Sequence, residues 1–79
     1  MTRIRWEVRY DRKVGYWSIW RERALFDTFR FKAYAVKRAA EHCRTYYYGG
    51  ELSELTIKRR DGTIQDKRTY GADPRRTRG

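Results

Sequence analysis

The residues in this sequence best suited to bind a ligand are arginines that alternate with aromatic and apolar side chains. Arginine outnumbers lysine 15 to 5, and Arg3, Arg5 and Arg9 alternate with Trp6 and Tyr10 near the start of the chain. A guanidinium presents planar donors that match phosphate oxygens, and an exposed aromatic ring can stack on a nucleobase. This combination favours binding to a polyanion, above all to nucleic acid.

We expect the binding residues to lie on strands, on turns and in the C-terminal segment. The candidates are Arg3, Arg5, Arg9, Trp20, Arg21, Arg23, Arg59, Arg60, Arg75, Arg76 and Arg78. Trp20 is the stacking or wedge residue, because alternation places it opposite the core and among the arginines. Contacts to the phosphate backbone of double-stranded DNA are favoured over base readout, since the sequence has no helix-turn-helix, zinc-finger or RNA-recognition signature.

The sequence does not favour catalysis or metal binding. His42 and Cys43 are adjacent, and neighbouring helix positions point about 100° apart, so the two side chains do not face each other as a base and a nucleophile would. We expect Cys43 to be a small core residue and His42 to be a solvated or edge residue. One histidine and one cysteine do not make a zinc site, and the acidic residues have no calcium-loop spacing. We therefore expect a protein without enzymatic activity and without a cofactor.

The same residues are also compatible with partners other than nucleic acid. Aromatic and arginine side chains are also typical of protein interfaces, so the chain could be a bacterial or phage module that binds an acidic host protein. An exposed strand edge could pair with a second copy to form a homodimer. The run Tyr46-Tyr47-Tyr48 could supply stacking rings or could shield the end of a helix.

Length and composition limit the architecture to one small domain. The chain has 79 residues and a formal net charge of +10, while 39% hydrophobic and 16% aromatic residues indicate a folded core. A single cysteine excludes an internal disulfide and favours a reducing compartment. The sequence has no apolar run long enough to cross a membrane and no export signal, so we expect a cytoplasmic protein.

The hydrophobic pattern predicts the elements that position these residues. Strands are expected at residues 3–10, 16–21, 25–29, 54–58 and 63–69, and an amphipathic helix at 32–47. Trp6 and Trp17 are expected in the core, and the Asp61-Gly62 pair predicts a tight turn. The expected fold class is α+β: an antiparallel sheet of four to five strands, in the order ββ(β)αββ, with one helix on one face. Residues 1–70 would form this domain and residues 71–79 a basic tail.

A series of short motifs carries a resemblance to a known family. They are Trp6, Gly15 with Trp17, Ala35-Val36-Lys37-Arg38-Ala39, Asp61-Gly62-Thr63-Ile64 and Tyr70-Gly71-Ala72-Asp73-Pro74. In this order they resemble domain-of-unknown-function family two-one-eight-eight, which contains small bacterial and phage proteins. The resemblance implies the fold but no activity. Phe31 stands where the family usually has a threonine before the helix, so the usual N-cap hydroxyl is missing.

Overall fold

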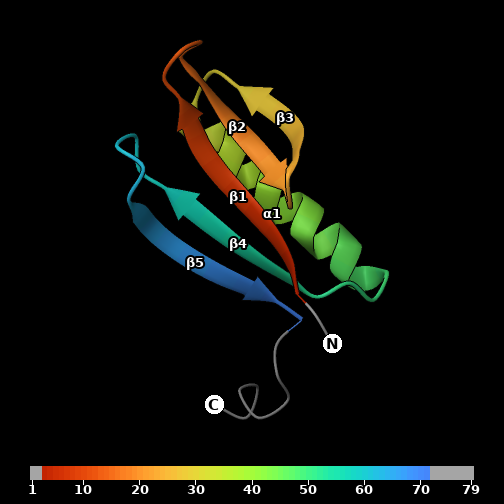
Figure 1. Cartoon of the computed structure of the whole chain (residues 1–79). Helices are drawn as coiled ribbons and strands as arrows, with labels where there is room; N and C mark the ends of the chain where they lie inside the picture. Colours follow the sequence, from red (N-terminus) through yellow and green to blue (C-terminus); the bar gives the residue numbers. More distant parts are fainter. Residues whose placement is uncertain (1–2, 72–79) are drawn as a thin grey trace.

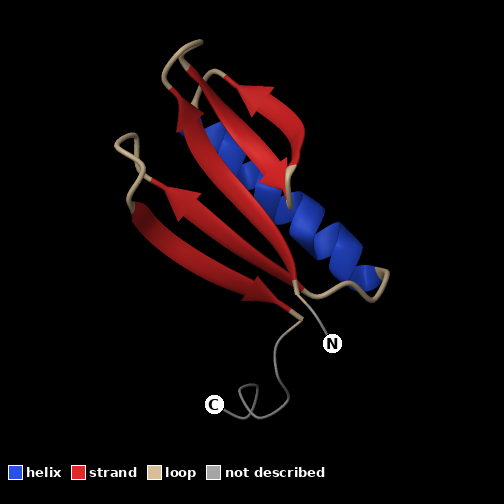
Figure 2. Ribbon diagram, in the orientation of Figure 1, coloured by secondary structure: helices blue, strands red, loops and turns tan. Residues whose placement is uncertain are grey.

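The computed structural model describes residues 3–71 as five strands and one helix (Figures 1 and 2). In chain order they are β1 (Ile4–Asp11), β2 (Tyr16–Arg21), β3 (Ala24–Phe29), α1 (Lys32–Tyr48), β4 (Ser53–Lys58) and β5 (Ile64–Tyr70). The expected α+β class is confirmed, including the third strand before the helix. Most of the expected basic tail, with Arg75, Arg76 and Arg78, lies outside the described residues.

The sheet is mixed and has the strand order β3-β2-β1-β4-β5. Three pairs are antiparallel, but β1 and β4 are parallel, with Trp6 opposite Leu55 and Val8 opposite Ile57. The expectation of an antiparallel sheet is therefore wrong for this central pair. The reason is the connection: β3 runs in the direction of β1, and α1 carries the chain back, so β4 begins at the same end as β1 (Figure 1). Pairing with a second copy would have to use an edge strand, β3 or β5.

The core lies between α1 and the face of the sheet that the helix covers (Figure 2). Alternation along β1 and its neighbours buries Trp6, Val8, Ile19 and Leu55 completely. The helix contributes small buried residues, namely Ala35, Ala39, Ala40 and Cys43. These small side chains let the helix lie close to the sheet while the large ring of Trp6 fills the remaining volume.

The other face of the sheet, which we call the open face, carries no helix among the described residues. It is formed by the side chains opposite the core, including Arg5, Glu7, Arg9, Ser18, Trp20, Thr56, Lys58 and Lys67. The expected division of β2 is confirmed, since Trp17 and Ile19 are buried on the helix side whereas Trp20 lies opposite Glu7 on the open face.

The two ends of α1 differ in how well they are capped. At the start, Phe31 occupies the N-cap position and makes no side-chain hydrogen bond, as its residue type predicts. At the other end, the Gly49 and Gly50 N–H groups donate to the carbonyls of Tyr46 (3.0 Å) and Tyr47 (2.8 Å). The helix is therefore closed by glycine at its C-terminus and left without a side-chain cap at its N-terminus.

Candidate nucleic-acid interface

The turns after β1 and β4 and the start of α1 lie at the same end of the molecule (Figure 1, upper left). This arrangement follows from the sheet, because β1, β3 and β4 all run toward that end. The cations in these three segments are Arg12, Lys13, Arg30, Lys32, Arg59 and Arg60. We call this part of the molecule the basic end.

Aromatic rings connect the segments of the basic end. Lys32 Nζ lies 5.1 Å from the ring centroid of Trp17, and the Trp17 ring lies 5.1 Å from that of Tyr10. Arg60 Cζ lies 4.6 Å from the Tyr10 ring. This row of side chains joins the start of α1 to the turn after β4 across the end of the sheet. A guanidinium stacked on a ring keeps the N–H groups along its edge available to an anion.

The carboxylates at the basic end are bound to turn backbone. Asp11 Oδ1 accepts a hydrogen bond from the Lys13 N–H at 3.0 Å, and Asp61 Oδ1 accepts from the Thr63 N–H at 3.0 Å. The Thr63 backbone and hydroxyl hydrogen bonds lower the pKa of Asp61. Among residues 3–71, no carboxylate lies within salt-bridge distance of any of the six cations of the basic end. Their positive charge is therefore not offset by ion pairs within the described part of the chain.

The N-terminus of α1 adds to this positive potential. The first turn of α1 contains no acidic residue, and Phe31 offers no acceptor to the free N–H groups. The positive end of the helix dipole and these N–H groups therefore face the basic end without a side-chain counter-charge from the first turn or the cap position.

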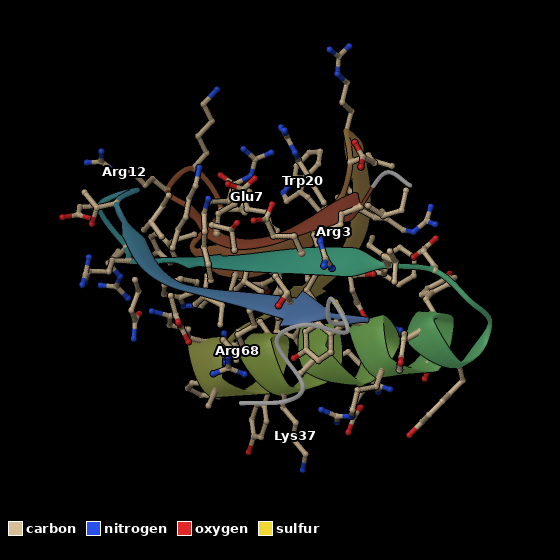
Figure 3. The ribbon with its side chains drawn as sticks, turned by 90° about the horizontal axis from the view of Figure 1, so that it is seen from below. Arg3, Glu7, Arg12, Trp20, Lys37 and Arg68 are labelled. Carbon is tan, nitrogen blue, oxygen red and sulfur yellow. The ribbon has the colours of Figure 1, made fainter. Side chains whose placement is uncertain are left out.

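A shallow groove of about 450 Å³ extends from the basic end onto the open face. Its lining residues are Arg9, Tyr10, Asp11, Arg12, Lys13, Ser18 and Trp20. Arg9 Cζ lies 4.2 Å from the Trp20 ring centroid, and Trp20 Nε1 donates to Ser18 Oγ at 2.9 Å. Figure 3 shows Trp20 on the side of the sheet away from α1. Trp20 thus has the orientation expected from alternation, but one side of its ring is covered by the Arg9 guanidinium.

The rest of the open face carries both signs of charge. The Glu7 carboxylate oxygens lie 3.7 Å from a guanidinium nitrogen of Arg9 and 2.5 Å from Lys58 Nζ. Glu54 Oε2 lies 3.9 Å from Lys67 Nζ. Surface pairs of this kind contribute little to stability, but they reduce the local positive potential. The open face away from the groove is therefore less suited to phosphate than the basic end.

Three of the predicted binding arginines lie at the opposite end of the molecule. Arg3 donates to the carbonyls of Tyr70 (3.2 Å) and Gly71 (3.4 Å), so it joins β1 to the end of β5. Arg21 lies opposite Trp6 in the register and points to the helix side, where it pairs with Glu51. The structure therefore does not place Arg21 beside the open-face arginines, because its strand position shares the parity of buried Trp17 and Ile19. Arg23 is exposed in the turn between β2 and β3.

The structure thus brings Arg59 and Arg60 to the basic end and places Arg5, Arg9 and Trp20 on the open face. Four cations of the basic end are not among the residues predicted from the sequence, namely Arg12, Lys13, Arg30 and Lys32. Arg59 is also partly structural, because its guanidinium donates to Thr63 Oγ1 at 3.2 Å and to the Ile64 carbonyl at 3.0 Å.

His42 and Cys43 both take part in packing between α1 and the sheet. The His42 ring centroid lies 5.8 Å from that of Trp6 and 4.7 Å from that of Phe26, and the residue is half-buried, so His42 is an edge residue and not a solvated one. Cys43 is buried as expected, and burial raises the pKa of its thiol to about 12. Within residues 3–71, no group of three or more metal-ligating side chains occurs, and no helix there is long and apolar enough to cross a membrane.

The His42 environment predicts a loss of stability in mild acid. Burial, and then the nearby Arg38 charge, lower the pKa of His42 below 6.5, although Asp27 and Glu41 act in the other direction. The unfolded chain therefore takes up a proton at a pH where the folded chain does not, and the free energy of unfolding falls as the pH drops below about 6.5. Thermal melts at neutral and mildly acidic pH would measure this change. The melting temperature of the His42→Gln variant should depend less on pH than that of the wild type. An equal pH dependence in both proteins would contradict the assignment to His42.

Comparison with known proteins identifies the family. The family model described as "Uncharacterized protein conserved in bacteria (DUF2188)" matches residues 6–70. The chain belongs to this family. The match confirms the resemblance carried by the sequence motifs and spans β1 to β5. Neither the curated proteins nor the solved structures contain a significant match to the chain. Membership of the DUF2188 family does not indicate a ligand.

Proposed function

We propose that this DUF2188 protein binds nucleic acid without catalysis, and that the basic end contacts the phosphate backbone of double-stranded DNA. The observation that carries the proposal is the collection of six cations from three separate segments at one end, with the nearby carboxylates bound to turn backbone. A ligand with closely spaced negative charges is the natural complement to such a surface.

The chemistry of the cations supports phosphate as the group that is bound. Four of the six are arginines, whose forked donors fit phosphate oxygens. The stacking of Arg60 on Tyr10 and of Lys32 on Trp17 restricts these side chains before a ligand arrives. Restricting them in advance lowers the entropy lost on binding.

Further contacts are proposed beside the basic end. Arg9 and Trp20 line the groove that adjoins it, so a bound backbone could continue onto this part of the open face. Arg75, Arg76 and Arg78 remain proposed as an additional contact. The proposed setting is the cytoplasm of a bacterium, with a phage genome as one source of such a protein.

The first experiment is a titration against fluorescent duplex DNA, single-stranded DNA and RNA of equal length. If the basic end supplies about six phosphate contacts, duplex affinity should fall about a thousandfold between roughly 50 and 200 mM salt. Nuclease-treated protein is required, because bound polynucleotide would mask the effect. Absence of binding to all three at low salt would overturn the proposal and would favour an acidic host protein as the partner.

A further inference from the structure

Two exposed aromatic rings stand beside the basic end. Phe31 is 58% exposed and Tyr34 is 61% exposed, and their ring centroids lie 5.9 Å apart at an interplanar angle of 77°. Both belong to the start of α1 and its cap position. They form a compact aromatic surface that the fold leaves open to solvent, which we call the Phe31–Tyr34 platform.

The folding of the domain does not account for Phe31. Serine, threonine, aspartate and asparagine stabilise a helix from the N-cap position, because a side-chain oxygen accepts from a free backbone N–H. Phe31 makes no such bond and also buries little of its ring. Phe31 therefore stabilises the helix less than a capping residue would and adds no side chain to the core. A residue with neither structural role is expected where it is needed to bind a ligand.

The charges around the platform identify the kind of ligand. Arg30 and Lys32 flank Phe31 in sequence, and Lys32 also belongs to the cation–aromatic row of the basic end. One turn along α1, Lys37 and Arg38 line a groove of about 480 Å³ together with Phe29, Tyr34 and Glu41. Arg38 lies 3.8 Å from Glu41. The other three cations, Arg30, Lys32 and Lys37, lie beyond salt-bridge distance of any carboxylate in residues 3–71. A ligand that is both planar and anionic would complement rings and charges together.

We infer that the Phe31–Tyr34 platform stacks on unpaired nucleobases, so the preferred DNA carries a single-stranded segment next to a duplex held by the basic end. This inference rests on the proposed function and names its substrate more closely. Nucleic acid is favoured over an acidic peptide because the platform continues into the basic end through Lys32, and one polynucleotide can occupy both. Stacking on exposed rings requires unpaired bases, since paired bases present no free face along a duplex.

Three fluorescent duplexes of identical sequence test the inference: one blunt, one with a single-stranded thymine tail, and one with an abasic tail of equal length. The abasic tail keeps the additional phosphates and removes the bases, so the comparison isolates stacking. The wild-type protein should bind the thymine tail about tenfold more tightly than the abasic tail, as expected for the loss of one or two stacked bases. Phe31→Ala and Tyr34→Ala should remove this difference while blunt-duplex affinity stays the same.

The variants have internal controls. Phe31→Ala removes a ring that is 58% exposed and brings no oxygen to the cap position, so its thermal midpoint should stay close to that of the wild type and the N–H groups at the start of α1 remain free. A loss of tail binding in this variant could then not be attributed to unfolding. Tyr48→Ala removes another ring, 84% exposed, from the far end of α1 and should change neither tail affinity nor blunt affinity.

The outcomes separate the inference from the proposed function. Equal wild-type affinity for thymine and abasic tails, with salt-dependent binding of the blunt duplex, would overturn stacking and leave backbone binding in place. A loss of blunt-duplex affinity in Phe31→Ala would also overturn stacking as the role of this ring. Failure of the wild-type protein to bind any of the three DNAs would overturn both.

Discussion

Replacing Trp6 by alanine should unfold the domain at room temperature. Trp6 is completely buried, and its ring contacts Phe26 (5.0 Å), Tyr46 (5.5 Å) and His42 (5.8 Å). Removing a buried tryptophan costs about 3–5 kcal/mol, because the transfer energy is lost and a cavity remains. A domain of this size has a total stability of similar magnitude, so little or no native population should be left. Far-ultraviolet circular dichroism with urea titration would measure the loss.

Trp20→Ala is the matched control, because it removes the same ring from the open face. Trp20 is only partly buried and has one hydrogen bond, to Ser18, together with the Arg9 guanidinium. The variant should keep a cooperative urea transition and the circular dichroism of the wild type. Unfolding of Trp20→Ala, or a stable Trp6→Ala domain, would show that the two faces of the sheet have been assigned incorrectly.

The faces could be predicted from sequence because alternation in β1 and β2 is nearly undisturbed. In β1, Arg5, Glu7 and Arg9 occupy one parity and buried Trp6 and Val8 the other. In β2, the large residues Trp17 and Ile19 alternate with Ser18 and are buried on the helix side. Alternation is less informative in β3, where the pairing with β2 shifts between Ile19 and Trp20. That irregularity lets Phe26 pack against Trp6 and His42 although it remains partly exposed. An irregular pairing depends on both strands, so the alternation of one strand does not reveal it.

The candidate interface was harder to predict than the fold. Arg59 and Arg60 stand out in the sequence as a basic pair, whereas Arg12 and Lys13 are part of an ordinary polar turn. The two basic pairs lie near each other because β1 and β4 are parallel, which brings the turns that follow these strands to one end of the molecule. Residue patterns within single segments contain no information about that direction. It follows only from the crossover through α1 and from the position that β4 takes beside β1.

Removal of charge from the basic end should reduce DNA binding far more than removal of equal charge elsewhere. The triple variant Arg12→Gln, Lys13→Gln and Arg60→Gln removes three proposed phosphate contacts. At about 0.9 per contact, the slope of log affinity against log salt should become shallower by on the order of three, and low-salt affinity should fall by roughly a hundredfold or more. Fluorescence anisotropy with duplex DNA at several salt concentrations would measure both quantities. Arg59 is left in place because its guanidinium bonds to Thr63 and Ile64 within the turn.

A second triple variant separates a localised site from general attraction. Arg23→Gln, Arg44→Gln and Lys67→Gln remove the same formal charge from exposed positions outside the basic end. Long-range attraction depends on total charge and falls equally in both proteins, whereas direct phosphate contacts are lost only in the first. The second variant should therefore keep most of the wild-type salt slope. If both variants lose the same slope, DNA is attracted by net charge without a defined interface, and the arrangement of turns at the basic end has no special role in binding.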